Sequence, residues 1–335
     1  MSRNAAICSR SSIDCRLGLL LCCAVAIVCL APRNSRADDP TGAAGKAEGP
    51  PKPKTIQLET NDGLQMEATY YPSPSENPKD AVPILMLHGW KGSGADYEKL
   101  AFDMQKQGHA VVVPDLRGHG KSTQIRAGTE LRTIDQALMG KAGFEAMVTQ
   151  DVEAVKKFLL ERNNAGELNI EKLCVIGADM GAVVAMNWAV HDWAAPKLLT
   201  GKQGQDVKAL VLISPPLNFH GISVVNALSS PTLQTELSVL IVVGGDKGNK
   251  GALDDAQRVY KRFGALRPKP PTDPDEARKR QDLFLDILKT SLQGAKILDD
   301  RKLETQVSAD IGQFIAWRLV DQRFPWSMRK SALGD

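Results

Sequence analysis

Cysteine is almost absent from the body of this 335-residue chain. Five of its six cysteines lie within residues 1–29, and only Cys174 follows them. A single thiol forms no internal disulfide and no thiolate metal site. Because Cys174 stands in an apolar stretch, we expect it to fill the core rather than to act as a nucleophile.

Aromatic residues and excess charge of one sign are also scarce. Phe, Trp and Tyr make up 5% of the chain, and 42 basic residues face 39 acidic ones. Nucleic-acid binding needs a basic surface and rings on which bases stack, so the sequence gives no indication of such a partner. No cofactor or metal is expected either, because "GADMGA" lacks the glycine spacing of a dinucleotide fingerprint and no cluster of metal ligands appears.

The chain has one long apolar run, at residues 17–31, and a segment with three arginines precedes it. The run is shorter than the roughly 20 residues that span a bilayer. With the small residues before Asp38, it is typical of a secretory leader. We predict that residues 1–37 form a signal peptide cleaved after Ala37 and that the protein is exported, either periplasmic or secreted. An uncleaved leader would instead be its one contact with a membrane.

Removal of this leader changes the charge balance. It takes away five of the 42 basic residues and one of the 39 acidic ones, which leaves 37 against 38. Residues 38–54 are rich in Pro, Gly, Ala and charge, so we expect a flexible linker. A single domain is predicted over residues 55–322, with a C-terminal tail at 323–335.

Apolar runs typical of buried strands alternate along the domain with helical spacing of apolar residues. An Asp-Gly step at 62–63 predicts a β-hairpin before them. Strands are expected at 83–89, 109–118, 172–178, 207–215 and 237–245, and helices at 95–108, 147–162, from 180 onward and at 253–264. The region 277–292 follows a Pro-rich loop, and 295–300 is a poorly marked candidate for the last strand. The alternation predicts a mostly parallel sheet of about eight strands with helices on both faces.

Three segments in this order resemble the α/β-hydrolase superfamily. "LMLHGWKGSGADYEKLAFDMQKQGHAVVVPDLRGHGKS" is similar to the third strand, first helix and fourth strand of the branch that contains serine aminopeptidases, lysophospholipases and monoacylglycerol lipases. "VIGADMGA" stands where that superfamily has its nucleophile elbow, and "LIVVGGDKG" resembles its seventh strand. The resemblance covers nearly the whole chain after the leader. Since only about 20 residues separate "LISPP" from the seventh strand, it implies a fold without a large cap domain.

The elbow carries Asp179 where the superfamily normally has serine. Gly177 and Gly181 flank it, and a sharp turn needs positions without side chains. The helix that follows directs its N-terminal N–H groups at the turn, so we expect the carboxylate to be ionised at neutral pH. Two interpretations remain open. Asp179 is a nucleophile, as in haloalkane dehalogenases and epoxide hydrolases, or it is an N-cap of the helix.

The resemblance also requires a histidine on the loop after the last strand, as general base. No histidine follows His220. The others are His88 and His119, which fit structural positions, His191, which lies too far along a helix, and His109. His220 is therefore the one plausible stand-in, and without a base a carboxylate attack would end in a trapped ester.

Other parts of a catalytic site can be assigned by resemblance. Asp246 fits the position of the triad acid or is a loop residue before Lys247-Gly248, and both interpretations remain open. The backbone N–H groups of Trp90 and Met180 fit an oxyanion hole. We add the hypothesis that Arg301 or Lys302 occupies the space of the absent imidazole and pairs with one of the carboxylates.

The sequence therefore predicts an exported α/β-hydrolase-fold protein with a degraded catalytic triad. Its expected function is non-catalytic, the binding of an unidentified small molecule or protein. The alternative is an active hydrolase of the ester, epoxide or haloalkane class, with Asp179 as nucleophile or base, Asp246 as auxiliary acid and His220 as proton carrier.

Overall fold

A computed structural model describes most of the chain after the predicted leader. The described residues are 49–196, 198, 201–246, 248 and 250–329. The predicted signal peptide, most of the predicted linker and the last six residues lie outside this part of the chain.

The predicted hairpin is present at the start of the domain. Strands β1 (Lys54–Glu59) and β2 (Leu64–Tyr71) pair antiparallel, and Gly63 in the turn between them has φ +89°. The end of the predicted linker is already held by the domain, since the Gln105 side chain donates a hydrogen bond to the carbonyl of Pro51.

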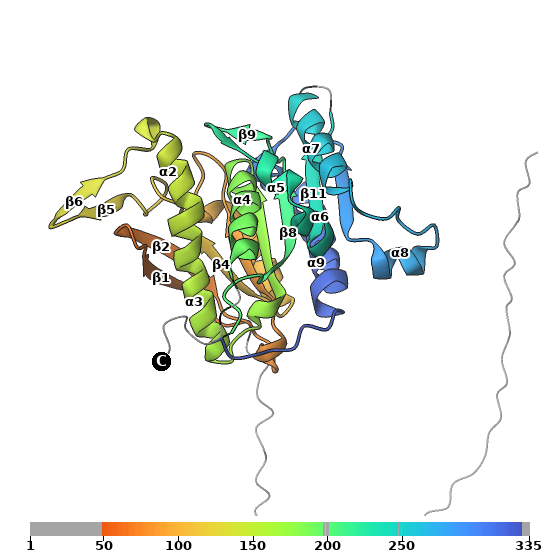
Figure 1. Cartoon of the computed structure of the whole chain (residues 1–335), viewed down its shortest axis with the longest axis horizontal. Helices are drawn as coiled ribbons and strands as arrows, with labels where there is room; N and C mark the ends of the chain where they lie inside the picture. The colour runs from red at the N-terminus through yellow and green to blue at the C-terminus, as the bar shows by residue number, and fades with distance from the viewer. Residues whose placement is uncertain (1–48, 197, 199–200, 247, 249, 330–335) are drawn as a thin grey trace, which may run out of the picture. The chain divides into compact units, whose positions relative to one another are not determined.

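Six parallel strands follow and form the larger part of the sheet, with the last of them along the chain at its edge (Figure 1). They are β3 (Pro83–Leu87), β4 (Ala110–Pro114), β7 (Leu173–Ala178), β8 (Val207–Ile213), β11 (Ser238–Gly244) and β12 (Leu283–Leu288). The spatial order is β12-β11-β8-β7-β3-β4-β2. Every residue of β3, β4 and β7 is buried, as expected for strands that are covered on both faces.

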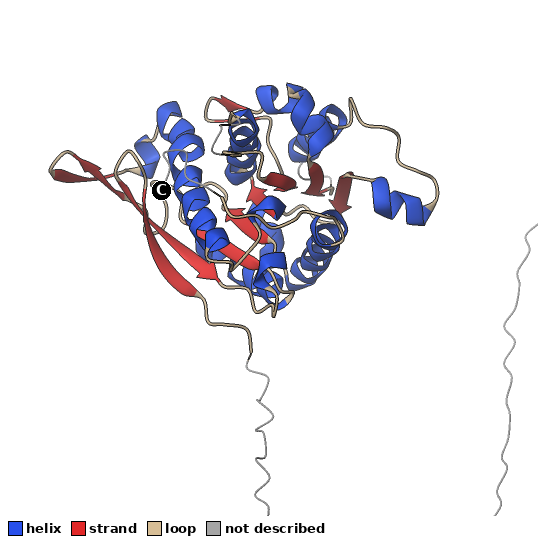
Figure 2. Ribbon diagram, turned by 60° about the horizontal axis from the view of Figure 1, so that its bottom comes forward, coloured by secondary structure: helices blue, strands red, loops and turns tan. Residues whose placement is uncertain are grey.

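Helices cover both faces of the sheet, as predicted (Figure 2). On one face α1 (Glu98–Lys106) and α9 (Arg301–Ile315) share an apolar cluster with the strands. On the other face α3 (Val152–Asn164), α4 (Met180–Ala194) and α7 (Lys250–Phe263) do the same. The mostly parallel α/β architecture expected from the sequence is confirmed.

The remaining helices and strands are short. They are α2 (Lys141–Ala146), α5 (Val225–Ser229), α6 (Pro231–Glu236), α8 (Pro274–Arg280), β9 (Asn218–Phe219) and β10 (Ile222–Ser223). Between β8 and β11 the chain forms the β9–β10 hairpin, α5 and α6, and no separate cap domain is built from these residues. Nowhere in the described ranges is a helix both long and apolar enough to span a bilayer.

The position predicted for the last strand is wrong. Residues Gly294–Asp299 form a 3₁₀ helix, and the last strand is β12, inside the region 277–292 that followed the Pro-rich loop. β12 pairs with β11 from Val239↔Leu283 onward. The loop after the last strand therefore begins at Lys289, six residues before the predicted strand.

A second hairpin was not predicted. β5 (Gln124–Ala127) and β6 (Glu130–Thr133) pair antiparallel and extend the sheet beyond β2, so that they project from the domain in Figure 1. Gly128 in the turn has φ +65°, and this glycine was the signal that the sequence offered for a hairpin.

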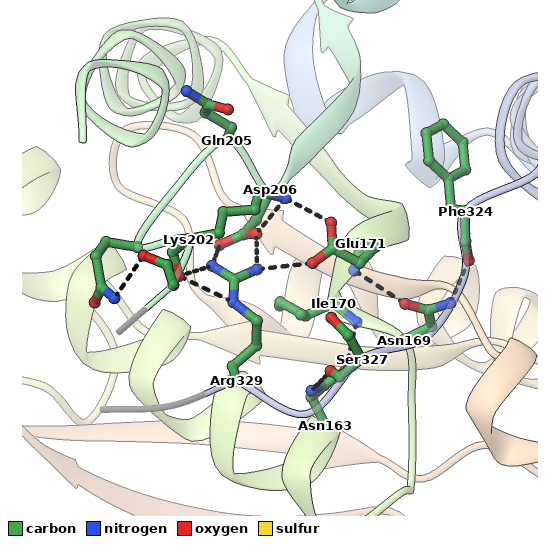
Figure 3. Close-up of polar contacts among 12 residues, drawn as sticks. Asn163, Asn169, Ile170, Glu171, Lys202, Gln205, Asp206, Phe324, Ser327 and Arg329 are labelled. Carbon is green, nitrogen blue, oxygen red and sulfur yellow. Dashed lines mark hydrogen bonds and ion pairs between the residues drawn. The ribbon is translucent and has the colours of Figure 1, made fainter. Parts of the chain in front are cut away.

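Residues 323–329, part of the predicted tail, cross the amino end of the sheet as an extended strap (Figure 3). The carbonyl of Phe324 accepts a hydrogen bond from the Asn169 side chain at 2.8 Å. At its end the guanidinium of Arg329 donates to the carboxylate of Asp206 at 2.5 Å. The domain therefore continues beyond residue 322, and we call residues 323–329 the C-terminal strap.

Candidate functional site

Asp179 occupies a sharp turn at the carboxyl end of β7. The strand ends at Ala178, α4 begins at Met180, and the residue between them has φ 48° and ψ −112°. Its backbone N–H is fixed by the carbonyl of Ile213 in β8 at 3.0 Å. A non-glycine residue in this region of the Ramachandran plot is strained, and such strain concentrates at functional sites.

Both elbow glycines are explained by contacts of the turn. A Cβ atom at Gly177 would overlap the backbone of Gly181, and a Cβ at Gly181 would overlap the carbonyl of Leu87 in β3. Without side chains at these two positions the turn closes on itself, and α4 starts directly against β3. The turn therefore presents the side chain of residue 179 at the carboxyl edge of the sheet.

The N-cap interpretation of Asp179 is wrong. Its side chain accepts no capping hydrogen bond from α4. Among the described residues, no donor is hydrogen-bonded to this carboxylate at all. The residue is thus placed by the strained turn, not by a helix-stabilising role of its side chain.

Burial raises the pKa of Asp179 to about 6, and the nearby charge of Lys296 offsets only part of this effect. We had expected the N-terminus of α4 to stabilise the carboxylate, but the loss of solvation outweighs it. At pH 7 the group is still ionised, by roughly ten to one, since one pH unit corresponds to a factor of ten.

A pocket of about 700 Å³ opens over the elbow. Its walls come from the loop after β3, the elbow itself and the loop after β12. The lining residues are Gly89, Trp90, Lys91, Gly92, Asp96, Asp179, Ser291, Leu292, Gln293, Ala295, Lys296 and Asp299. This volume is large enough for a small organic molecule.

The loop after β12 lies directly over Asp179. Gly294 has φ +58°, and a Cβ atom there would overlap the Asp179 carboxylate. The neighbouring Gln293 is turned away into the scaffold, because its amide oxygen accepts from the Ser214 hydroxyl at 2.7 Å and its amide nitrogen donates to the Gly244 carbonyl at 2.9 Å. Where the resemblance requires an imidazole, this loop presents backbone.

His220 is placed near the pocket but not in its lining. It sits with φ 44° in the exposed turn between β9 and β10, and its ring stacks on Phe144 at 5.0 Å. It also contacts the Trp90 ring, at 5.2 Å between centroids. Trp90 lines the pocket, so the structure brings His220 against the wall of the pocket without a hydrogen bond to Asp179.

His88 has a structural role, as the sequence indicated. Its Nε2 accepts from the backbone N–H of Leu116 at 3.0 Å, so Nδ1 carries the proton and donates to the carbonyl of Gly89 at 2.8 Å. Burial lowers its pKa to about 4, so the ring is neutral at pH 7. This histidine fixes the loop that carries Trp90 and is not available as a base.

Three other predicted residues do not line the pocket that contains Asp179. Asp246 is exposed beyond β11, with its N–H bonded to the carbonyl of Thr290, and it does not line the pocket. Arg301 and Lys302 are exposed in the first turn of α9, outside the pocket. The hypothesis that either cation fills the space of the imidazole is wrong.

Lys296 is the cation that acts on Asp179, and sequence reasoning missed it. It lies in the 3₁₀ helix Gly294–Asp299, within the segment that was interpreted as a strand. Its side chain lines the pocket but forms no ion pair with a described carboxylate. Correct placement of β12 was the information needed to find it.

The predicted oxyanion-hole groups have no hydrogen-bond acceptor among the described residues. The backbone N–H groups of Trp90 and Met180 donate to no acceptor within the described ranges. No group of three or more His, Cys, Asp or Glu side chains suited to a metal occurs there either. Cys174 is fully buried in β7, in the core position that was predicted for it.

A family model described as alpha/beta hydrolase fold matches residues 82–237. Curated relatives include a non-heme chloroperoxidase from Burkholderia pyrrocinia, 41% identical over 54 residues, which are 16% of this chain and 19% of the relative. An sn-1-specific diacylglycerol lipase from Danio rerio is 29% identical over 142 residues, 42% of this chain and 36% of the relative. The chain thus aligns with about a fifth to a third of the length of these relatives.

Solved structures extend the likeness over most of the domain. An esterase from Pyrococcus furiosus superposes with a TM-score of 0.55 at 16% identity, covering 80% of this chain and 92% of the esterase. A soluble variant of monoglyceride lipase from Saccharomyces cerevisiae gives 0.54 at 13% identity, covering 84% and 99%. At these identities the likeness establishes the fold alone.

Proposed function

This chain has the α/β-hydrolase fold, and from that premise we propose that it is an exported binding protein whose elbow pocket holds a ligand without turning it over. The observation that carries the proposal is the loop after β12. That loop contributes the backbone of Gly294, a scaffold-bound Gln293 and the cation of Lys296, and no imidazole.

The chemical reason is the fate of a covalent intermediate. A carboxylate that attacks the saturated carbon of a haloalkane or epoxide forms an ester on the enzyme, while the halide leaves or the epoxide C–O bond opens to an alkoxide. Water must then be deprotonated to hydrolyse that ester, and a positioned base does this. Lys296 is a cation and Gln293 is a neutral amide without a proton-accepting role, so neither replaces the base. The pocket can therefore bind a ligand, and Asp179 can react with it at most once.

The second candidate is an active hydrolase with Asp179 as nucleophile. The strained backbone at Asp179 and the free N–H groups of Trp90 and Met180 favour it. A haloalkane dehalogenase from Psychrobacter cryohalolentis is 30% identical over 78 residues, 23% of this chain and 25% of that enzyme. Under this candidate His220 would have to swing past Trp90 to serve as base.

Export remains part of the proposal, and the leader supports it. Residues 1–37 have the basic segment, apolar run and small residues of a signal peptide. Expression of the full chain in a bacterium, fractionation and N-terminal sequencing of the product test it. A mature protein that begins at Asp38 in the periplasm or medium supports export, and an intact Met1 in the cytoplasm refutes it.

The catalytic question is tested with the purified domain. We expect no multiple turnover of nitrophenyl esters, epoxides or haloalkanes by the wild type above that of Asp179→Ala. Intact-mass spectrometry after incubation with the epoxides and haloalkanes separates the two candidates further. Repeated turnover that is lost in Asp179→Ala overturns the binding proposal, whereas an adduct on Asp179 that accumulates without turnover agrees with it.

A further inference from the structure

We propose that the elbow pocket recognises an organic cation, a ligand whose protonated amine pairs with Asp179 and whose apolar part lies against Trp90. This inference rests on the proposed binding function and names the chemical class of the ligand.

The carboxylate of Asp179 is partly shielded from water and has no hydrogen-bond or ion-pair partner among the described residues. It is half-buried, the turn strains its backbone, and no described residue donates a hydrogen bond to it. A partly buried charge without a partner costs free energy unless something binds that compensates it. A cationic donor entering from the pocket supplies that compensation.

The cation that influences Asp179 is not paired with it. Lys296 lines the pocket and influences Asp179, yet the two form no ion pair. Its stem belongs to the short 3₁₀ helix Gly294–Asp299. Lys296 is thus a competitor that a ligand amine displaces, not a permanent partner.

The rest of the pocket favours a cation as well. Besides Asp179 it is lined by the carboxylates of Asp96 and Asp299, against the two lysines Lys91 and Lys296, so its side chains carry one excess negative charge. Trp90 is one of the lining residues, and a cation near an indole face gains a further attraction. An anionic ligand would meet these three carboxylates at close range.

The pocket has room for such a molecule beside the carboxylate. Its volume is about 700 Å³, and Gly89 places no side chain beside Asp179, where a Cβ would lie 3.0 Å from the carboxylate oxygen. An aromatic or alkyl amine of modest size fits this space, with its nitrogen near Asp179 and its apolar part toward Trp90.

Three probes of one shape test the charge requirement on the purified domain. Benzylamine is cationic, benzoate is anionic and benzyl alcohol is neutral. Binding is followed by NMR titration, with the indole N–H signals and the carboxyl signal of Asp179 as readouts. We expect benzylamine to bind at least tenfold more tightly than the other two. Benzoate binding as tightly as benzylamine, or benzylamine failing to bind at millimolar concentration, overturns the inference.

Two variants with opposite expected effects locate the binding. Asp179→Asn should weaken benzylamine binding at least tenfold, whereas Lys296→Met should strengthen it because the competing cation is removed. Asp254→Asn, an exposed carboxylate on α7, serves as control and should change nothing. Weaker binding in Lys296→Met, or unchanged binding in Asp179→Asn, contradicts the proposed pairing.

The pH dependence adds an independent check. Benzylamine stays protonated between pH 5 and pH 7, whereas Asp179 titrates near pH 6. Affinity should therefore fall about tenfold between pH 7 and pH 5 and remain flat in Asp179→Asn. A flat profile in the wild type refutes the inference. Turnover of a substrate would instead refute the binding function, so the two failures remain distinguishable.

Discussion

Two carboxylates at opposite edges of the same sheet, the buried Asp206 and the half-buried Asp179, differ in their partners. Asp206 precedes β8 and is fully buried, yet three cations surround it: Lys202 at 3.1 Å, Lys156 at 3.3 Å and Arg329 at 2.5 Å. Asp179 follows β7 and has no partner among the described residues. Both lose solvation, but among the described residues only Asp206 is paired with cations.

The pKa directions reflect this difference. At Asp206 burial acts to raise the pKa, but Lys156, Lys202 and Arg329 together lower it below its ordinary value. At Asp179 burial raises the pKa, and the charge of Lys296 does not reverse the effect. A compensated carboxylate strengthens the fold, whereas an uncompensated one is kept at a cost in stability. This contrast is why we assign function to the elbow and a structural role to the cluster at the C-terminal strap.

The largest expected effect on stability comes from removing Arg329 from the ion pairs around Asp206. Arg329 bridges Asp206 and Glu171 (Figure 3), and its guanidinium is almost fully buried. Arg329→Ala should lower the free energy of unfolding by about 3 kcal/mol, because carboxylates that keep their burial lose a cation. Denaturant unfolding measures the change. Arg323→Ala, an exposed arginine of the same strap, is the control, and an equal loss in both variants would show that the cluster adds no stability.

The second prediction is an increase in the free energy of unfolding, caused by a substitution at Asp179. The folded-state pKa of Asp179, about 6, lies above its ordinary 3.8, so the folded chain binds this proton more tightly than the unfolded chain does. The associated stability is present below about pH 4 and is lost as pH rises through 6. Asp179→Asn cannot ionise, so it should match the wild type at pH 4 and exceed it by about 2 kcal/mol at pH 7.

Unfolding curves for the two proteins at several pH values between 4 and 7 provide this measurement. The exposed Asp254→Asn variant should show no such pH-dependent gain over the wild type. If Asp179→Asn is less stable than the wild type at pH 7, then the carboxylate has a partner within the fold and the contrast with Asp206 is lost.

The smallest effect tests how closely the loop after β12 covers the elbow. Gly294→Ala should cost about 1–2 kcal/mol, from its left-handed backbone and from the overlap with Asp179. In the Asp179→Ala background the overlap disappears, so the cost of Gly294→Ala should be smaller. Thermal or denaturant unfolding of the four proteins in this double-mutant cycle gives the coupling energy. Gly251→Ala, where a Cβ meets open space, is the control, and strict additivity would mean that the loop does not touch Asp179.

The fold was largely predictable, because apolar runs indicate buried strands and apolar residues at helical spacing indicate helices. The strands β3, β4, β7, β8 and β11 were found in this way. β12 was missed because "LFLDIL" is short, carries Asp286 and follows a charged helix, so its periodicity fits a strand or a helix end equally well. Pairing with β11 decides the matter, and that contact is not local.

The candidate site was predictable only in part. The elbow, its glycines and Asp179 could be located from spacing, and the lack of a histidine after residue 220 was evident. The cation near Asp179 was not found, since Arg301 and Lys302 were considered and Lys296 was placed in a strand. The N-cap interpretation also failed, because a residue type compatible with capping says nothing about the strained backbone that turns the side chain away.

The order of residues by itself determined the α/β architecture, the tight turn around position 179 and the replacement of serine by aspartate there. Only the tertiary structure decided which buried carboxylates are compensated. Compensation depends on charges brought within a few ångströms from distant segments. Arg329 is brought to Asp206 across more than a hundred residues, while no cation of the described residues forms an ion pair with Asp179.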